Sequence, residues 1–359
     1  MTELKEICKV QCGFAFDSKK FTEDDSFSPL IRIRDVKRGF TQTYYTGEFS
    51  SEYIVHKGDL LVGMDGEFNI ARWNSEDALL NQRVCRIIAN SNVNEEYLRF
   101  YLKRALKLIE SKTSFVTVKH LSAKELNGLK LNLPCMEDQQ CISKQLSILE
   151  LVIRKNKKVL ELFDELVKAR FVEMFGDPVT NDMLWNTDVL KDICTKIGSG
   201  STPRGGKESY IDEGISLIRS MNVHNAYFEY KDLAHITLDQ AEKLNNVVVE
   251  HDDLLFNITG ASVARCCVVP SDVLPARVNQ HVCILRCREK INPIFLQELL
   301  VNENYQGKLL QIAKSGATRE AINKQQLESL EIVLPPLELQ NQFASFVQEI
   351  DKSRLLSNH

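Results

Sequence analysis

The sequence contains the same series of short blocks twice, and this repetition constrains the fold more than any other feature. LKEIC at Leu4–Cys8 returns as LKDIC at Leu190–Cys194, and LNGLKLNLP at Leu126–Pro134 returns as LESLEIVLP at Leu327–Pro335. Three further pairs lie between them in the same order: LIR and LIR, GDLLVGMDG and DDLLFNITG, NQRVC and NQHVC. A repeat of this length, with extra residues only between the blocks of the second copy, predicts two domains of one fold.

Each copy has a strand-rich part followed by helices. The strand-rich part runs to about residue 90 in the first copy and about residue 288 in the second. Within LIRIRDV, isoleucines alternate with Arg32 and Arg34, which predicts a half-buried strand with its arginines outward. A helix is expected at 94–112, and its counterpart begins near Pro293, a residue type that suits the first helical turn.

The segment after Pro134 has the heptad pattern of a coiled coil. Read in alternating steps of four and three, its seam is apolar at eight of ten positions, which favours a coiled coil over a helix lying on a globular core. Gly176 and Pro178 end the helix, so 137–175 would extend roughly 58 Å. The seam positions are Ile142, Leu146, Leu149, Ile153, Asn156, Leu160, Phe163, Val167, Arg170 and Met174, and their partners in the second copy are Phe343, Val347 and Ile350.

The second copy has fewer residues for its last helix. The first copy has residues 135–175 after its proline, whereas only residues 336–359 follow Pro335. We expect the C-terminal helix to be short, either naturally or by truncation, and to leave the seam around Leu160–Met174 without a partner in the same chain. Another copy of the chain or a bound subunit could then cover that part of the seam.

The charge balance excludes a globally basic nucleic-acid coat protein. Lys and Arg number 45 against 49 Asp and Glu, which gives a net charge of −4, but local basic patches remain compatible with DNA binding. The sequence has no membrane-spanning run and no secretory leader pattern, so we expect a cytoplasmic protein. Its ten cysteines are expected to be reduced thiols rather than disulfides or zinc ligands.

Two similar domains held apart by a spacer helix suit a DNA target with two different half-sites. Arg32 and Arg219 occur in both copies and are expected to be structural or to contact phosphates. The other basic residues differ between the copies and are candidates for base edges or nearby phosphates, because Arg forks onto guanine and Lys neutralises phosphate. The candidate DNA-contacting residues are Arg32, Arg34, Lys37, Arg38, Arg204, Lys207, Arg219 and Arg319.

The sequence predicts no catalytic residue and no metal site of its own. Asn292–Phe295 lacks the second proline of an adenine methyltransferase motif and is interpreted as a helix cap. Asp65 and Glu67 are close together, but the second copy keeps neither, which argues against a metal site there. His281 is replaced by Arg83 in the first copy, which argues against a catalytic histidine. The shared pairs Asn81–Gln82 and Asn279–Gln280 could hydrogen-bond adenine, although ties from a loop to the backbone are favoured.

A set of segments in the second half also carries a family resemblance. The segments are LKDIC, IGSGSTP, DLLFNITGAS, ARVNQHVCILR, SGATREAI and LPPLELQNQF, with FVEMFGDP at Phe171–Pro178 before them. The chain resembles, over essentially its whole length, the specificity (S) subunit of a type I restriction–modification system.

The resemblance implies an α+β fold with two similar strand-rich target-recognition domains, separated by long helices that form an antiparallel coiled coil. It implies a bipartite double-stranded DNA target, two modification subunits that use S-adenosylmethionine to methylate adenine, and restriction subunits that use ATP and Mg²⁺. The subunit itself would carry no cofactor and would not be an enzyme on its own. The expected domains are 1–135 and 177–336 for target recognition, with spacer helices at 136–176 and 337–359.

Two other functions stay open at this point. The chain could be a coiled-coil adaptor whose domains no longer bind DNA, or the specificity part of a stand-alone methyltransferase or nuclease. The absence of methyl-transfer and ATP-binding motifs from the sequence argues against a stand-alone enzyme.

Overall fold

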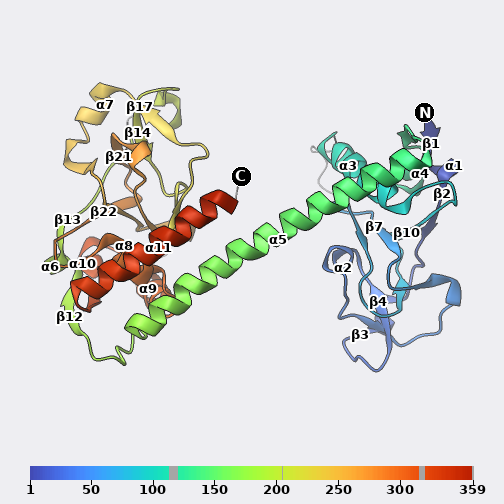
Figure 1. The fold of residues 1–359 in the computed structure, drawn as a ribbon, viewed down its shortest axis with the longest axis horizontal. Helices are drawn as coiled ribbons and strands as arrows, with labels where there is room; N and C mark the ends of the chain where they lie inside the picture. Colours follow the sequence, from blue (N-terminus) through green and yellow to red (C-terminus); the bar gives the residue numbers. More distant parts are fainter. Residues whose placement is uncertain (113–119, 204, 315–319, 358–359) are drawn as a thin grey trace. The chain divides into compact units, whose positions relative to one another are not determined.

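The computed structural model describes residues 1–112, 120–203, 205–314 and 320–357. The chain divides into two compact units, Met1–Arg154 and Lys155–His359 (Figure 1). Each unit combines a four-stranded antiparallel sheet, a second sheet that contains one parallel pair of strands, and several helices.

In the first unit the antiparallel sheet has the order β2-β10-β7-β8 and the second sheet the order β3-β5-β4-β9-β6, while β1 pairs with β11. The strands are β1 Thr2–Glu3, β2 Cys8–Cys12, β3 Phe21–Thr22, β4 Ser28–Ile31, β5 Tyr44–Tyr45, β6 Ile54–Val55, β7 Leu60–Gly63, β8 Asn69–Arg72, β9 Ala78–Leu80, β10 Val84–Ala89 and β11 Lys130–Leu131. The helices are α1 Leu4–Ile7, α2 Ile33–Arg38, α3 Glu95–Lys112, α4 Ala123–Asn127 and α5 Met136–Phe175, which continues into the second unit.

In the second unit the antiparallel sheet has the order β13-β22-β19-β20 and the second sheet the order β17-β14-β21-β18, while β12 pairs with β23 and β15 with β16. The strands are β12 Asn186–Val189, β13 Cys194–Ser199, β14 Ile215–Ile218, β15 Val223–His224, β16 Tyr227–Phe228, β17 Ala234–Ile236, β18 Val248–Val249, β19 Leu254–Asn257, β20 Cys266–Val268, β21 Ala276–Val278, β22 Val282–Cys287 and β23 Glu331–Leu334. The helices are α6 Leu190–Ile193, α7 Leu238–Glu242, α8 Pro293–Val301, α9 Glu303–Lys314, α10 Lys324–Glu328 and α11 Leu337–Ser357.

The two units share the topology of their main sheets, as the repeated blocks predict, although β3 in the first unit and the pair β15/β16 in the second have no counterpart. The strand order β2-β10-β7-β8 corresponds to β13-β22-β19-β20, and the parallel pair β4/β9 corresponds to β14/β21. The predicted helix at 94–112 is α3, whereas its counterpart is broken into α8 and α9. Asn292 caps α8 by accepting from the backbone N–H of Ile294 at 2.9 Å, which confirms the interpretation of Asn292–Phe295 as a helix start.

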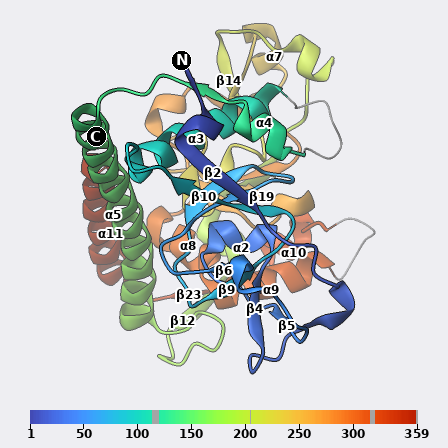
Figure 2. The ribbon, with the colours of Figure 1, turned by 90° about the vertical axis from the view of Figure 1, so that its right-hand side faces the viewer.

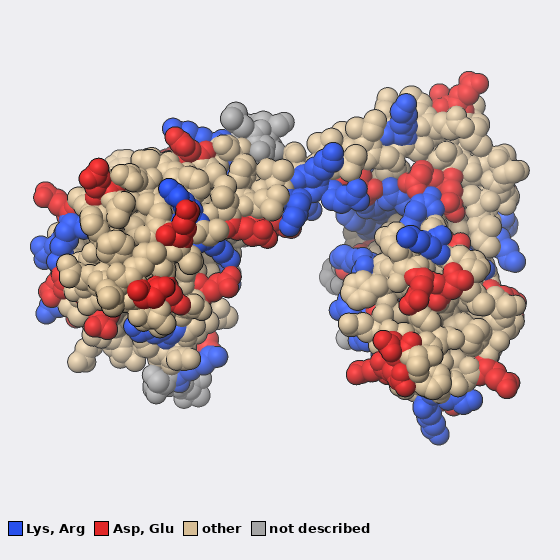
Figure 3. All heavy atoms as spheres, turned by 60° about the horizontal axis from the view of Figure 1, so that its bottom comes forward, with Lys and Arg blue, Asp and Glu red and all other residues tan. Residues whose placement is uncertain are grey.

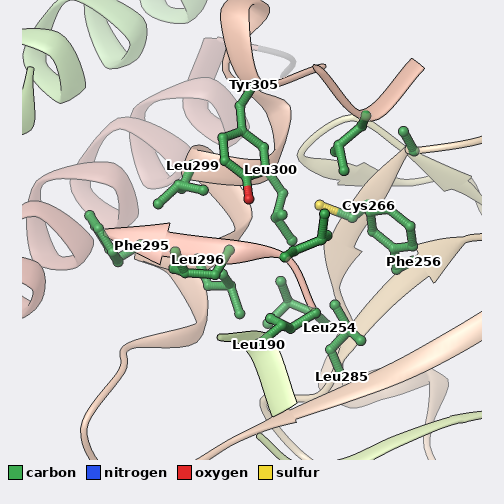
Figure 4. Close-up of a cluster of buried hydrophobic side chains, with 14 of the residues drawn as sticks. Leu190, Leu254, Phe256, Cys266, Leu285, Phe295, Leu296, Leu299, Leu300 and Tyr305 are labelled. Atoms are coloured by element: carbon green, nitrogen blue, oxygen red, sulfur yellow. The ribbon is translucent and has the colours of Figure 1, made fainter. Parts of the chain in front are cut away.

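The core of the second unit lies between its antiparallel sheet and its helices. Strand side chains such as Leu254 and Phe256 face α8 and α9, where Phe295 and Tyr305 are fully buried (Figure 4). The buried hydroxyl of Tyr305 donates to the carbonyl oxygen of Glu331 at 2.7 Å, so its polar end is satisfied.

The strand predicted for LIRIRDV is wrong beyond Ile31. Strand β4 ends at Ile31, and residues 33–38 form the short helix α2. A carboxylate oxygen of the buried Asp35 accepts from the backbone N–H of Arg32 at 2.8 Å, and Gly39 ends the helix with a φ of 77°. This local capping overrides the period-two alternation of the sequence.

One buried glutamine in each unit joins the last strand to the helices. Gln139 accepts from the N–H of Asn94 at 2.8 Å and donates to the carbonyl of Pro134 at 2.9 Å. Gln340 makes the same two bonds in the second unit, to Asn292 at 2.9 Å and to Pro335 at 2.8 Å. The identical geometry fixes where α5 and α11 begin on their domains.

The last turns of α5 pack antiparallel to α11 inside the second unit (Figure 2). Phe171 and Phe175 contact Phe343, near the start of α11, with ring centroids 5.6 and 5.5 Å apart. Asp164, earlier on α5, pairs with Arg354, near the end of α11, at 2.5 Å. The predicted α+β fold with long helices in antiparallel contact is therefore confirmed.

The expectation that Leu160–Met174 would lack a partner is wrong. Helix α11 begins beside the end of α5 and runs back along it, so Phe163, Val167 and Met174 lie against the core that contains Val347 and Ile350. Among the seam positions, the exposed apolar residues lie earlier on the helix and are Ile142, Leu149 and Ile153.

A buried carboxyl group lies where α8 meets these helices. Glu298 is 8% exposed, and Gln297 donates a hydrogen bond to it at 2.9 Å. Asp164 on α5 and Asp351 and Arg354 on α11 also act on this carboxyl. Burial is the largest cause that raises the pKa of Glu298 from 4.5 to about 7, because desolvation disfavours the charged form.

We predict that Glu298→Gln stabilises the second unit at pH 8 but not at pH 5. The unfolded chain releases this proton near pH 4.5 and the folded chain near pH 7, so wild-type stability falls as the pH rises between these values. The neutral amide avoids that loss, and the expected gain is on the order of 2–3 kcal/mol in the free energy of unfolding, measured by denaturant titration.

Glu303→Gln is the matched control, because Glu303 is exposed and forms an ion pair with Lys168. Its effect should be small and should not grow between pH 5 and pH 8. An equal effect of Glu298→Gln at both pH values would contradict the prediction.

Candidate nucleic-acid interface

Arginines surround two adjoining cavities in the first unit. A cavity of about 650 Å³ is lined by Arg32 and Arg34 together with the polar side chains of Gln42 and Thr43. Arg32 also lines a neighbouring cavity of about 300 Å³, which contains Arg83. The strand β4 ends at Ile31, so the chain turns there and leaves Arg32 and Arg34 exposed. The remaining lining residues are Phe21, Thr22, Glu23, Asp25 and Tyr44 of the larger cavity and Phe16, Ser18, Phe21, Ile33, Asn81 and Gln82 of the smaller one.

The other two predicted residues of the first unit lie on α2. The Lys37 ammonium forms an ion pair with Glu67 at 3.1 Å, and both side chains are about two-thirds exposed (67% and 65%). An exposed pair of this kind contributes little to stability, so Lys37 can exchange Glu67 for a phosphate at little cost. Arg38 is exposed at the end of the helix.

Arg219 occupies the position of Arg32 in the second unit but has different surroundings. Its guanidinium donates to the carbonyl oxygen of Asp232 and lies 5.4 Å from the ring centroid of Tyr210. Its backbone N–H donates to Asn222 at 3.1 Å, as that of Arg32 does to Asp35. The two positions therefore share their backbone geometry, but the guanidinium of Arg219 is bonded to its own domain, whereas the side chain of Arg32 lines a cavity.

Each unit contains two turns that are connected through their side chains, at corresponding positions in the two units. In the first unit Asp65 pairs with Arg83 at 3.1 Å and with His120 at 2.5 Å. In the second unit the Thr259 hydroxyl and His281 Nδ1 lie 2.6 Å apart. The backbone bridges Asp65–His120 and Thr259–Ala321 show that the turns correspond, so an ion pair in one unit is replaced by a hydrogen bond between a hydroxyl and an imidazole in the other.

The turn of the second unit borders a cavity of about 370 Å³. His224, Arg265 and His281 line it, and their ring and guanidinium nitrogens can form hydrogen bonds. The other lining residues are Ser220, Met221, Thr259, Gly260, Ala261 and Ser262. This cavity and the smaller arginine-lined cavity include corresponding positions, His281 and Arg83, but present different side chains.

The shared asparagines hold their turns together, as the sequence interpretation favours. Asn81 accepts from the backbone N–H of Gln82 at 2.9 Å, and Asn279 accepts from that of His281 at 3.0 Å. The Gln280 side chain accepts from the Thr202 hydroxyl, so it connects the IGSGSTP segment to this turn.

Some predicted residues cannot be placed. Arg204 and Arg319 lie outside the described residues, as does the side chain of Lys207. Conversely, the sequence interpretation did not select Arg265 or His224, which line the cavity of the second unit. Both lie in segments where the two copies differ, and that difference is the signal that could have identified them.

The chemistry of these cavities is that of polar recognition. On the face shown in Figure 3, basic and acidic side chains are interspersed over each unit. Arg and His side chains in a cavity can donate to base edges, and exposed Lys and Arg can bind phosphates. Within the described ranges, no group of three or more His, Cys, Asp or Glu side chains is arranged to hold a metal ion. None of the described helices has the length and apolar character needed to cross a membrane.

Solved structures share this architecture. The S subunit of a type I restriction–modification system from M. genitalium matches with a TM-score of 0.63 and 13% identity, over 99% of this chain and 90% of that one. A chain from a structure titled for complex assembly and conformational transition of the type I restriction–modification system matches with a TM-score of 0.52 and 18% identity, over the same shares.

Comparisons of sequence agree with the structural ones. The chain is 30% identical to the EcoBI specificity subunit of Escherichia coli, over 97% of this chain and 78% of that protein. It is 21% identical to the MjaVIII specificity subunit of Methanocaldococcus jannaschii, over 84% of this chain and 74% of that protein. The model of the type I restriction modification DNA specificity domain matches residues 1–162 and again 183–359. With both halves matched in this way, the chain belongs to the type I restriction–modification specificity family and is a specificity subunit with two recognition domains.

Proposed function

We propose that this specificity subunit recognises a bipartite DNA sequence, with one short half-site for each domain. The observation that carries the proposal is the corresponding pair of turns, which share their backbone but differ in side chains: Asp65 and Arg83 in one unit, Thr259 and His281 in the other. A constant framework with variable polar side chains suits two domains that bind the same polymer but distinguish different bases.

In the first domain, we propose that Arg32, Arg34, Lys37 and Arg38 contact the target. Arg32 and Arg34 share a cavity with amide and hydroxyl groups, which favours base edges. Lys37 and Arg38 lie on the exposed helix α2, which favours phosphates.

In the second domain, we propose contacts from Arg204, Lys207 and Arg319, joined by Arg265 and His281 from the cavity. Arg219 would act by holding its turn, because its guanidinium is already bonded to the carbonyl of Asp232.

The proposed domains are 1–135 and 177–336 for recognition, with spacer helices at 136–176 and 337–359. The spacer helices would set the length of the non-specific gap in the target. Support comes from the buried glutamines Gln139 and Gln340, which mark the same change from domain to helix in both copies.

The chemistry would belong to partner subunits. We propose two modification subunits that methylate adenine with S-adenosylmethionine, and restriction subunits that use ATP and Mg²⁺, acting together in the cytoplasm. Support comes from membership of the specificity family and from the similarity to the EcoBI specificity subunit.

We predict that the equivalent arginines respond differently to alanine. Arg219→Ala should lower the free energy of unfolding by about 1–3 kcal/mol, because the carbonyl of Asp232 loses its donor and Tyr210 loses its neighbour. Arg32→Ala should change it by less than about 0.5 kcal/mol, because that side chain is exposed. Denaturant titration of both variants measures this, and equal effects would show that the two positions are equivalent after all.

The test of the function is a map of methylated adenines in cells that express this chain with its modification subunit. We expect methylation within a two-part motif with a fixed gap. In Arg32→Ala/Arg34→Ala, we expect the base preference to relax in one half of that motif while the other half is unchanged.

Arg104→Ala is the matched control, because Arg104 is exposed on α3 and lines neither cavity of the first unit. It should leave both halves of the motif unchanged. A continuous motif, or none at all from a complex shown to assemble, would rule out the proposal.

A further inference from the structure

An apolar stripe is exposed on α5 within the first unit. Ile142 is 37% exposed, Leu149 56% and Ile153 57%, with Val152 beside them at 46% and Leu146 half-buried. We call these five residues the α5 stripe. Single exposed apolar side chains need no explanation, but a contiguous row along one helix is typical of an interaction surface.

The second unit shows what covers this surface elsewhere in the same fold. Counted from the shared prolines Pro134 and Pro335, Ile142 corresponds to Phe343 and Leu149 to Ile350. Phe343 is 0% exposed and Ile350 9%, because the last turns of α5 run antiparallel across them. The fold therefore accommodates an antiparallel helix at this position.

The α5 stripe has a spacing that fits a copy of itself. Ile142, Leu146, Leu149 and Ile153 follow one another in steps of four, three and four, which read the same in both directions. Two such helices packed antiparallel would place Ile142 against Ile153 of the second copy and Leu146 against Leu149 of the second copy, with two-fold symmetry.

The charges at the two ends of the stripe favour the antiparallel direction. Glu137 and Asp138 precede the stripe, whereas Arg154, Lys155 and Lys157 follow it, and all five are exposed. An antiparallel pair brings the acidic end of one helix to the basic end of the other. A parallel pair would place like charges together at both ends.

We propose that the α5 stripe is a self-association surface, on which the stripe of a second copy of this chain packs in antiparallel orientation. A foreign helix would need only apolar side chains at the correct spacing. The spacing is compatible with any heptad helix, whereas the opposite charges at the two ends match those of a second, antiparallel copy of the same helix, and this favours a second copy. The inference does not depend on which bases the domains recognise.

The first test is the oligomeric state of the purified full-length chain. Sedimentation across a concentration series should show a monomer–dimer equilibrium, which Leu149→Glu/Ile153→Glu should weaken on the order of tenfold or more. Leu151→Glu is the control, because Leu151 is 39% exposed and lies on the opposite side of α5. A wild-type chain that stays monomeric, or a stripe variant that dimerises as well as wild type, overturns the proposal.

The second test fixes the direction of pairing. In a chain with the exposed cysteines Cys135 and Cys141 changed to serine, Ile142→Cys and Ile153→Cys are made as separate, differently tagged variants. Oxidation of their mixture should give a disulfide between the two variants, because an antiparallel pair brings these positions together. Disulfides within either variant alone, or none in the mixture, contradict antiparallel pairing. Unchanged circular dichroism would show that the variants are folded.

Discussion

A buried amide in each domain sets the geometry on which the rest of the structure depends. Gln139 and Gln340 each bridge the end of a strand segment and the start of a helix, with about three-ångström hydrogen bonds on both sides. Neither amide has access to water, at 1% and 0% exposure, so loss of either bond would leave a buried polar group unpaired. Because the same clamp occurs twice, α5 and α11 leave their domains in the same way. The faces that they present to their neighbours can then be compared position by position.

The duplication separates scaffold from variable surface without any other sequence for comparison. The asparagines that hold the turns, Asn81 and Asn279, are kept, whereas the pair that joins the turns changes from Asp65 and Arg83 to Thr259 and His281. The change keeps a contact between the two turns while removing both formal charges when the histidine is neutral. A domain can thus alter the polarity of its cavity without altering its backbone, and a specificity subunit needs this freedom to recognise different bases.

Much of the fold could be predicted from the sequence, because repeats and heptads are signals in the chain itself. The bounds of α5 and the cap at Asn292 follow from side-chain periodicity and local hydrogen-bonding chemistry. The helix α2 could not be predicted, because one buried carboxylate, Asp35, outweighs an alternating pattern. The expectation that Leu160–Met174 would lack a partner was also wrong, because heptad spacing identifies a seam but not the helix that covers it. The different roles of Arg32 and Arg219 depend on Tyr210 and the carbonyl of Asp232, and the sequence does not indicate that these groups lie nearby.

The helix contacts of the two units respond to pH in opposite directions. In the first unit Glu150 on α5 accepts from Arg99 and Lys103 on α3, and these bonds lower its pKa to about 2. Their stabilising effect is present above the ordinary glutamate pKa and is lost as the pH falls towards 2. Asp351 lies at the corresponding place on α11, but it is near Glu298 and has a raised pKa, because burial outweighs its contact with Arg354. As the pH rises through about 7, Glu298 becomes charged near Asp351 and this one contact between α8 and α11 weakens, whereas the ion pair of the first unit keeps its full strength at neutral pH. One fold thus joins its corresponding helices by an ion pair in the first unit and beside a buried carboxyl group with a raised pKa in the second.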